Sequence, residues 1–353
     1  MIQTPFRGIG LMCGTSHDGI DICDVSFELS NSTWSFDVHA SDSIPLSGPL
    51  KEKLSRATEM TAIEYVILDK EFATFSAEAV VNFIKKSTSK ASFIASHGVT
   101  IFHQPERGIS TQLGSSAIIA ALTGLQTISD FRIQDVTKGG QGAPLVPYAD
   151  SMLFSNYDAT LNLGGFANIS RLKNPVTGFD IGVCNLLLNH LSMRLNCTFD
   201  EGGELAKSGQ VNKQLLNQLN DLPFFKQSGP KSLGKEWFDQ VLLPVIENFN
   251  SIRTQDLLAT GSEHIAFQIG KILNIEKEIC LVSGGGVHNA HLIERIKHFS
   301  KSDIIIPSAS IINFKEAICF AFLGNLRLLQ SDNISRSTTG ANQNSCAGAV
   351  YLP

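Results

Sequence analysis

Near the N-terminus, the residues best suited to bind a ligand or take part in a reaction lie in one turn, GTSHDG at residues 14–19. Asp21 follows this turn. Successive backbone N–H groups in a tight turn form a concave anion site, and glycine lets phosphate oxygens approach the main chain. The hydroxyls can donate further hydrogen bonds, and Asp18 can hold Mg²⁺ through water. The turn therefore predicts phosphate binding, and an ordinary hairpin turn is the alternative. It is not a Walker loop, because GK[ST] is missing and a strand follows.

Two further glycine turns follow strand-like segments. NLGGFANIS at residues 162–170 places Gly164 and Gly165 between two strands, and SGGG at 283–286 follows a strand and opens a helix. A glycine-rich helix N-terminus suits a nucleotide phosphate. Ordinary turn chemistry is the alternative at each site. Three such turns in two similar halves favour a nucleotide held between two lobes.

Asp180 is the candidate acid. It ends a short strand, GFDIG at 178–182, between Phe179 and Ile181. Partial desolvation in this apolar context would raise the pKa of its carboxyl and suit general-base catalysis. The alternative is that Asp180 caps the N-terminus of the following helix.

Two basic side chains could contact a ligand. His97 follows a buried strand in SHGVTIFH, and Arg132 closes DFR. A guanidinium binds carboxylate or phosphate with two parallel hydrogen bonds. A structural histidine and an ion-paired arginine are the alternatives. His264, His288 and His291 lack zinc-ligand spacing, so no metal site is predicted from them.

The secondary-structure elements that would position these residues occur twice in the same order. Strand, glycine turn, strand, strand and helix occur in the first 90 residues and again from about residue 159, which indicates an α/β fold built from two similar halves. Residues 138–147 are expected to form a loop or connector and residues 314–329 a buried helix. The polar segment 330–345 is expected to be a mobile loop.

Composition narrows the class of protein. The chain has 353 residues, 43% hydrophobic, with 28 Lys+Arg against 33 Asp+Glu and a formal net charge of −5. This charge gives no support for a nucleic-acid partner. The N-terminus lacks the pattern of a signal peptide, and no uncharged apolar run has the length of a membrane span. A cytoplasmic protein with no membrane partner and seven reduced cysteines is expected.

The motifs, taken in chain order, resemble those of the anhydro-N-acetylmuramic acid kinase family, in the sugar kinase, actin and Hsp70 superfamily. They are GTSHDGID, SHGVTIFHQP, DFR with GGQGAPLVP, NLGGFANIS, FDIGVCN, FDEGGELAKSGQV, PKSLGKEWF and SGGGVHN. The resemblance covers about residues 7–350. It implies a two-lobed, actin-like ATPase fold of the ribonuclease H-like type, with mixed sheets flanked by helices and a central cleft. We expect lobes at 1–130, with 340–353 as a candidate completion, and at 131–339.

The resemblance also implies a reaction. ATP, with Mg²⁺, would phosphorylate O6 of 1,6-anhydro-N-acetylmuramic acid while water opens the anhydro bridge, and Asp180 would be the base. The sugar would contact His97, Arg132, Asn168 and Glu316. The cofactor-binding residues would be Gly14, Thr15, Ser16, His17, Asp18, Gly19, Ile20, Asp21, Gly164, Gly165, Gly284, Gly285 and Gly286. The oligomeric state is left open, with a homodimer as one possibility.

Several residues depart from the family pattern. His17 replaces a leucine, Val99 a glutamine, Ile181 a threonine, Val183 a proline and Cys184 a glycine. Lost hydrogen bonds at these positions leave open a kinase for a different amino sugar or anhydrosugar, or a non-catalytic regulator that binds nucleotide or sugar. A hydrolase using Asp180 with Glu316 is a third alternative, and would require the two carboxyls to lie about 5–9.5 Å apart.

Overall fold

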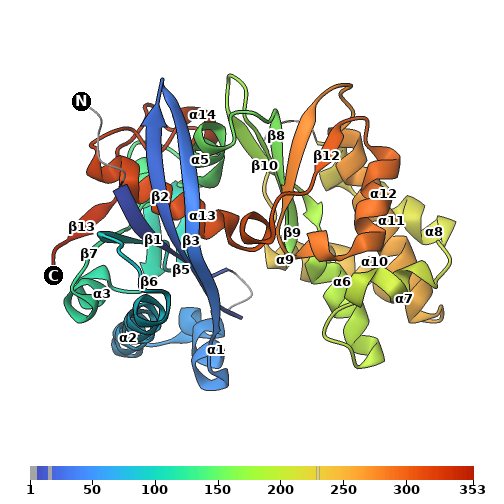
Figure 1. Ribbon diagram of the computed structural model, residues 1–353. Helices are drawn as coiled ribbons and strands as arrows, with labels where there is room; N and C mark the ends of the chain where they lie inside the picture. Colours follow the sequence, from blue (N-terminus) through green and yellow to red (C-terminus); the bar gives the residue numbers. More distant parts are fainter. Residues whose placement is uncertain (1–5, 15–17, 228, 230) are drawn as a thin grey trace. The chain divides into compact units, whose positions relative to one another are not determined.

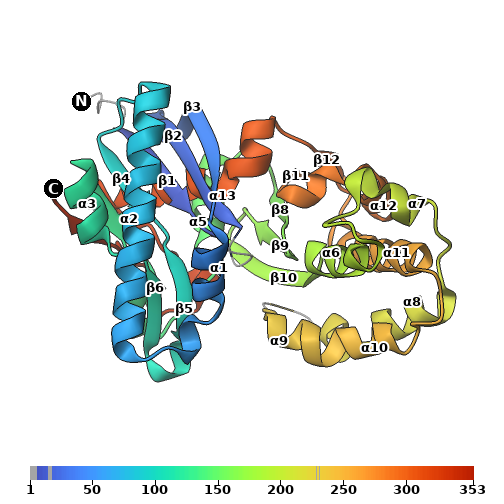
Figure 2. The ribbon, with the colours of Figure 1, turned by 90° about the horizontal axis from the view of Figure 1, so that it is seen from below.

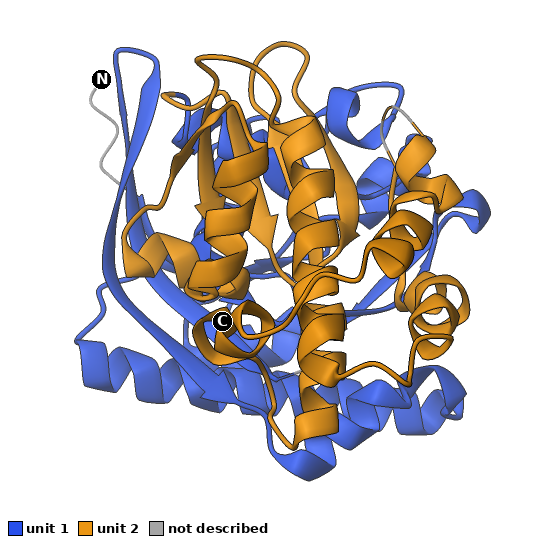
Figure 3. Cartoon of the chain, turned by 90° about the vertical axis from the view of Figure 1, so that its right-hand side faces the viewer, with its two compact units in different colours: residues 1–155, 314–353 blue, residues 156–313 orange. Residues whose placement is uncertain are grey.

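The computed structural model describes residues 6–14, 18–227, 229 and 231–353, and the chain divides into two compact units (Figures 1 and 3). Unit 1 comprises residues 1–155 and 314–353, and unit 2 comprises residues 156–313. These boundaries differ from the predicted ones at 130/131 and 339/340. The reason is that segments 131–155 and 314–339 pack against the sheet of unit 1 instead of belonging to the second half.

Unit 1 is built on a mixed six-stranded sheet of order β13-β7-β4-β1-β2-β3. Strands β1 to β3 form an antiparallel meander, β4 and β7 run parallel to β1, and β13 closes the edge antiparallel to β7. The three successive strands predicted in the first 90 residues are thereby confirmed. The strands are β1 (Phe6–Met12), β2 (Gly19–Ser30), β3 (Thr33–Pro45), β4 (Phe93–Ser96), β7 (Gln126–Ser129) and β13 (Ala349–Tyr351), with a separate hairpin of β5 (Val99–Gln104) and β6 (Ile109–Leu113).

Helices cover both faces of this sheet (Figures 1 and 2). On one face α1, α2 and α3 share a core with Ile9 and Leu11 of β1. On the other, α13 lies directly on the strands. The helices are α1 (Gly48–Ser55), α2 (Ala62–Ser87), α3 (Ser116–Thr123), α4 (Ile133–Thr137), α5 (Val146–Leu153), α13 (Ala309–Leu328) and α14 (Arg336–Thr339), with 3₁₀ turns η1 (Ala57–Glu59) and η2 (Pro105–Arg107).

Unit 2 contains a mixed five-stranded sheet of order β10-β9-β8-β11-β12. Its strands are β8 (Ala159–Leu163), β9 (Phe166–Arg171), β10 (Thr177–Val183), β11 (Ile279–Ser283) and β12 (Asp303–Ile305). The main helices are α6 (Asn185–Ser192), α7 (Glu204–Lys207), α8 (Lys213–Asn220), α9 (Lys235–Trp237), α10 (Leu243–Glu247), α11 (Thr254–Ile272) and α12 (Ala290–Phe299). Short turns are η3 (Met193–Leu195), η4 (Glu201–Gly203), η5 (Pro223–Lys226), η6 (Phe238–Leu242) and η7 (Gly285–His288).

The two sheets share one topology. In each, the first three strands form a meander, and the fourth and fifth add parallel to the first, which gives the order 3-2-1-4-5 with strand 2 alone reversed. This is the ribonuclease H-like arrangement of actin-like ATPases, so the predicted fold class and internal repeat are confirmed. The β1–β2 turn of unit 1 and the β8–β9 turn of unit 2 consequently occupy equivalent positions. So do the ends of β4 and β11.

Helix α13 is the apolar helix predicted near residues 314–329. Among the described residues it is the helix with the length and composition of a membrane span, and most of it is buried inside the structure. It packs so closely that a Cβ added to Gly10 would lie 1.9 Å from the carbonyl oxygen of Ala317. This burial is characteristic of a core helix.

The polar segment 330–345 is folded into unit 1, so the expectation of a mobile loop is wrong. The Asn333 amide nitrogen donates to the carbonyls of Leu323 and Ala347 at 3.0 and 2.8 Å, and Thr339 donates to the buried Asp135 carboxylate at 2.7 Å. Asp135 also accepts the N–H of Gly142 at 2.8 Å. Polar side chains therefore fix this segment to the glycine-rich loop 138–145 and to the core.

The contact between Gly10 and α13 is testable by Gly10→Ala. The added methyl group must displace the helix or the strand, and overpacking of this kind costs about 1–3 kcal/mol. Thermal unfolding should show a clearly lower midpoint. The matched control is Gly48→Ala at the start of α1, where a Cβ meets nothing within 4 Å. Equal midpoints for the two variants would contradict the close packing.

Candidate active site

The two glycine turns of unit 2 lie together. Strands β8 and β11 pair with Asn162 opposite Ser283, so the segments that follow are neighbours. Gly284 has a φ of 87°, and a Cβ there would lie 2.4 Å from Asn162 Oδ1 and 2.9 Å from the Leu163 carbonyl carbon and oxygen. A Cβ on Gly286 would lie 2.7 Å from that of Leu163. The close approach requires glycine at both positions.

The β8–β9 turn is held by the start of α6. The carbonyl of Gly165 accepts the N–H groups of Cys184 and Leu186 at 2.8 and 3.2 Å, and that of Gly164 accepts from Asn185 at 3.1 Å. The Asn185 side chain donates to the Leu163 carbonyl at 2.9 Å. These bonds satisfy N–H groups that a helix start otherwise leaves unpaired. They also fix the conformation of the turn, as a preorganised phosphate site requires.

The equivalent turn in unit 1 is only partly described, because the predicted residues Thr15, Ser16 and His17 lie outside the described residues. Gly14 precedes them. Gly19 begins β2, and Ile20 is buried in the core with 2% exposure, so the Ile20 side chain faces the core and only its backbone is suited to a ligand.

The two acids of this turn differ in environment. The Asp18 carboxylate is 70% exposed and contacts Lys51. Asp21 accepts a hydrogen bond from the Ser43 hydroxyl at 2.7 Å. Desolvation raises the pKa of Asp21, and the Ser43 bond opposes this shift.

A row of polar residues crosses the meander of unit 2. Asn162 on β8 pairs with Asn168 on β9, which pairs with Asp180 on β10. Residues directly opposite each other in antiparallel strands project to the same face with Cβ atoms about 4.5–5.5 Å apart. The row therefore places two amides beside the predicted base. Asn162 was not predicted as a site residue.

Asp180 is held by the segment at residues 231–233. Its N–H donates to the carbonyl of Lys231 at 2.9 Å, and its Oδ2 accepts the N–H of Leu233 at 2.8 Å. A register shift between Asp180 and Gly182 marks a bulge in β10 at this point. Asp180 lies within the strand, and Cys184 occupies the N-cap position of α6. The alternative that Asp180 caps this helix is therefore wrong.

The electrostatic environment of Asp180 suits a base. Desolvation raises the pKa of its carboxyl above the ordinary value, and the Leu233 hydrogen bond partly opposes the shift. The bond engages Oδ2, which leaves Oδ1 as the oxygen suited to proton transfer. A carboxylate with a raised pKa and a fixed orientation is a stronger proton acceptor at neutral pH than a solvated one.

His97 and Arg132 form a buried pair in unit 1. His97 Nδ1 lies 2.9 Å from the carbonyl of Gly98, which can only accept, so Nδ1 carries the proton and Nε2 accepts from Arg132 Nη2 at 2.7 Å. Arg132 Nη1 donates to the carbonyl of Gly142 at 2.6 Å. Desolvation and then the Arg132 charge lower the pKa of His97 to about 3. His97 is thus a neutral acceptor that orients Arg132.

Glu316 lies near this pair on α13. Phe320, one helical turn further, places its ring centroid 4.7 Å from that of His97. Desolvation lowers the pKa of Arg132 to about 10, and Glu316 acts in the opposite direction. Desolvation also raises the pKa of Glu316. Unit 1 therefore gathers His97, Arg132 and Glu316, whereas the predicted residues Asn168 and Asp180 belong to unit 2.

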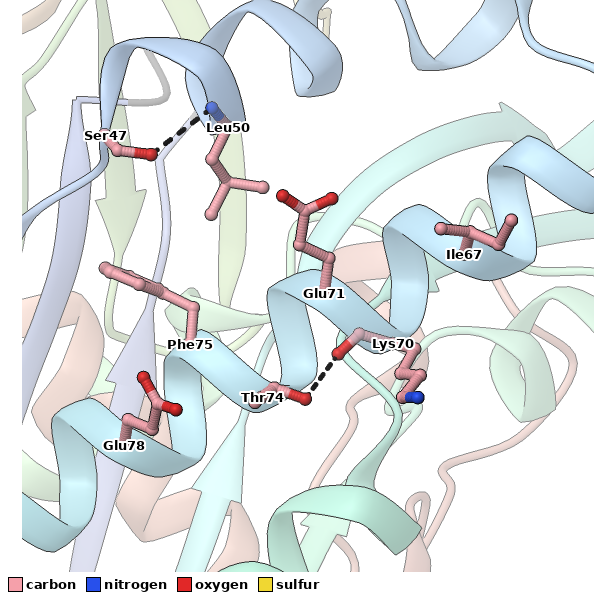
Figure 4. A pocket seen from close by; sticks show the side chains of 8 residues that line it. All are labelled: Ser47, Leu50, Ile67, Lys70, Glu71, Thr74, Phe75 and Glu78. Atoms are coloured by element: carbon pink, nitrogen blue, oxygen red, sulfur yellow. Dashed lines mark hydrogen bonds between the residues drawn. The ribbon is translucent and has the colours of Figure 1, made fainter.

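A surface pocket of about 470 Å³ lies between α1 and α2 of unit 1 (Figure 4). Ser47 caps α1 by accepting the N–H of Leu50, and Glu71 and Glu78 project from α2 beside it. None of the predicted site residues lines this pocket. Among the described residues no group of three or more His, Cys, Asp or Glu side chains is placed to hold a metal ion.

The duplicated ribonuclease H-like sheets, with a glycine turn after the first strand of each, define the actin-like ATPase class. A model of the anhydro-N-acetylmuramic acid kinase family matches residues 6–353. The anhydro-N-acetylmuramic acid kinases of Hydrogenovibrio crunogenus and Photobacterium profundum are 34% and 35% identical to the chain, with 98% of each sequence covered. That of Aliivibrio fischeri is 35% identical over 97% of this chain and 98% of its own. The chain belongs to the anhydro-N-acetylmuramic acid kinase family, whose members are ATP-dependent sugar kinases.

The buried neutral His97 predicts a pH-dependent stability. Its folded pKa of about 3 lies below the unfolded value of 6.5, so the unfolded state binds more protons between these values. The contribution of neutral His97 to the free energy of unfolding is complete above pH 6.5. It is lost as the pH falls toward 3, at about 1.4 kcal/mol per pH unit. Denaturant unfolding of His97→Asn should show a shallower loss of stability over pH 4–6. The exposed His298→Gln is the control, and an unchanged slope in His97→Asn would contradict the assignment.

Proposed function

We propose that this chain phosphorylates O6 of 1,6-anhydro-N-acetylmuramic acid with ATP while water opens the anhydro bridge, in cytoplasmic recycling of the cell wall. Water oxygen bonds to C1 as the C1–O6 bond breaks. O6 then bonds to the γ-phosphorus as its bond to the bridging oxygen of ADP breaks. The products are N-acetylmuramate 6-phosphate and ADP. Family membership over residues 6–353 carries the proposal.

Asp180 is the proposed base. It takes a proton from the attacking water, which increases the nucleophilicity of the water oxygen as the bond to C1 forms. The Leu233 N–H holds the carboxylate in one orientation, and desolvation raises its pKa. Asn168, opposite Asp180 in the strand register, would hydrogen-bond the water or a sugar hydroxyl. A positioned base of this kind contributes about 10²–10⁴-fold to the rate.

The glycine turns are the proposed ATP site. Gly164 and Gly165 would bind phosphate through their backbone, and Gly284 to Gly286 would lie against the adenosine, with the β1–β2 turn as the second phosphate site. The absence of room for a Cβ at Gly284 and Gly286 supports this, because the turns pack too closely for side chains. Fixed backbone donors stabilise the charge that develops during phosphoryl transfer.

Magnesium fits the acids of the β1–β2 turn. Mg²⁺ in phosphoryl-transfer sites takes one or two carboxylates, water and substrate phosphates, so a dedicated cluster of three protein ligands is not required. Asp18 is exposed and paired with Lys51, and would exchange this partner for a magnesium-bound water. The ion would neutralise phosphate charge when bound.

The sugar contacts in unit 1 centre on Arg132. Its guanidinium is positioned by His97 and by the Gly142 carbonyl, and its fork suits the lactyl carboxylate of the substrate. His97 acts through Arg132, since both of its ring nitrogens already have partners. Glu316 would accept hydrogen bonds from sugar hydroxyls.

Four of the five substitutions that depart from the family pattern lie in the cores of the two units, and His17 lies outside the described residues. Val99, Ile181, Val183 and Cys184 are 2%, 3%, 2% and 0% exposed. Buried apolar side chains do not contact a ligand directly. Their burial supports the family's own sugar as substrate over the alternative of a different amino sugar. A homodimer stays a prediction.

The reaction is tested by mass spectrometry of the product. Purified protein with anhydro-N-acetylmuramic acid, ATP and Mg²⁺ in ¹⁸O-water should give N-acetylmuramate 6-phosphate, with one ¹⁸O at C1. N-acetylmuramic acid and N-acetylglucosamine are the comparison substrates. ADP formation with these sugars but not with the anhydrosugar would overturn the proposed substrate. No ADP with any sugar would favour the regulator.

The role of Asp180 is tested by Asp180→Asn. This change removes the proton acceptor while keeping the shape and the Leu233 hydrogen bond. We expect kcat to fall by about 10²–10⁴-fold with the affinity for ATP within about threefold of wild type. Asp239→Asn, an exposed acid paired with Lys235, is the matched control in the same unit. Wild-type turnover by Asp180→Asn would show that another group is the base.

A further inference from the structure

A buried ion pair in unit 1 has no part in the reaction derived so far. Lys315 Nζ on α13 lies 2.9 and 2.8 Å from the two carboxylate oxygens of Asp150 on α5. The side chains are 4% and 0% exposed. The Cys319 thiol, one turn further along α13, lies 3.4 Å from Asp150 Oδ1. This is the most deeply buried ion pair recorded within the described ranges.

The pair occupies a distinctive place in the chain. Asp150 lies five residues before the chain leaves unit 1 at 155/156, and Lys315 lies two residues after it returns at 313/314. The ion pair therefore joins the two segments by which the chain exits and re-enters unit 1. Glu316 directly follows Lys315.

The first turns of α13 thus present two sets of side chains. Lys315 and Cys319 contact Asp150 on α5. Glu316 and Phe320, also four residues apart, lie toward the pair of His97 and Arg132, since the rings of Phe320 and His97 are in contact. Residues at this spacing share a helix face. Fixing Lys315 on one face therefore fixes the rotation of the helix that presents Glu316 on the other.

Packing stability alone does not account for this pair. Moving two charges into a protein interior costs several kcal/mol, and well-packed apolar residues of similar size are often as stable. The charged groups that act on Glu316 are Lys315, Asp150, Asp21 and Arg132, and the effect of Lys315 is the largest of these. Lys315 favours the carboxylate form of Glu316, against the desolvation that disfavours it.

We propose that Lys315, anchored by Asp150, is a positioning residue for the sugar half-site, which holds Glu316 in place and keeps its carboxylate ionised. The inference rests on the proposed contact of Glu316 with the sugar. Without the Lys315 charge, Glu316 would bind a proton at higher pH and lose its ability to accept two hydrogen bonds from hydroxyl groups.

The test measures the ionisation of Glu316 directly. Full-length protein carrying δ-¹³C-glutamate is titrated by NMR, and the Glu316 resonance is identified by its loss in Glu316→Gln. Lys315→Met should raise the Glu316 midpoint by about one pH unit or more, whereas Lys315→Arg, which keeps the charge, should leave it near wild type. The acid limb of kcat/KM for the anhydrosugar should move in parallel.

Two further variants separate this role from a structural one. Lys315→Met/Asp150→Asn also removes the buried carboxylate that Lys315→Met leaves unpaired, so the double variant should fold even if Lys315→Met does not. The double variant should raise the Glu316 midpoint by less than folded Lys315→Met, because Asp150 itself raises the pKa of Glu316 and acts more weakly than Lys315. Arg7→Met breaks the Arg7–Asp24 pair, whose carboxylate is also 0% exposed. It should lower the unfolding midpoint without moving the Glu316 titration.

The inference is overturned if the Glu316 midpoint stays fixed in folded Lys315→Met, if it moves without any change in the kcat/KM profile, or if the double variant also fails to fold. A wild-type protein that turns over no anhydrosugar would instead refute the proposed function. The NMR titration reads the ionisation of Glu316 without requiring turnover, so the two failures are distinguishable.

Discussion

The antiparallel register of β8, β9 and β10 is the constraint on which the candidate chemistry depends. It sets Asn162, Asn168 and Asp180 in one row. The parallel pairing of β8 with β11 separately brings the β8–β9 turn beside the end of β11. A slip of one residue in any of the three strands would turn that strand's polar side chain to the opposite face and break the row. The glycines at 284 and 286 and the bonds from the start of α6 hold the turns in this register. The proposed base and the proposed nucleotide site thus both depend on β8, which pairs antiparallel with β9 and parallel with β11.

Unit 1 is constrained differently, because several of its charged side chains are buried and need partners. Arg132, Glu316, Lys315 and Asp150 are concentrated around the first turns of α13, where each charge requires a partner. His97 solves part of this problem as a neutral acceptor for Arg132, and its pKa of about 3 keeps it neutral over the physiological range. An arginine fixed in this way loses little side-chain entropy when it binds an anion. Burial of the Arg132 guanidinium costs free energy, but it also leaves this group already oriented to bind a carboxylate.

Much of this was predictable from the sequence, for identifiable reasons. The two meanders follow from alternating apolar residues separated by glycine turns. Asp180 is the candidate base because an acid inside an apolar strand is unusual, and this role stays a prediction. Asn162 was missed, although Asn162 and Asn168 are equidistant from Gly165, and a hairpin centred there must pair them. The segment 330–345 was mispredicted because Asn333 and Thr339 resemble loop residues by composition, whereas they bond to buried groups. The unit boundary was misplaced because Asp150 and Lys315, distant in sequence, pair in space.

In the proposed reaction, the two units would contribute different types of chemical group. Unit 2 offers amides and one desolvated acid, a combination suited to orienting water and accepting its proton while remaining compatible with a polyanionic phosphate. Unit 1 offers a guanidinium and a carboxylate, a combination suited to a sugar that carries both a carboxylate and hydroxyls. Val99, Ile181, Val183 and Cys184, which depart from the family pattern, are buried in apolar cores, where their side chains affect packing. For this reason the chemistry of the family is expected to be retained although its motifs are altered.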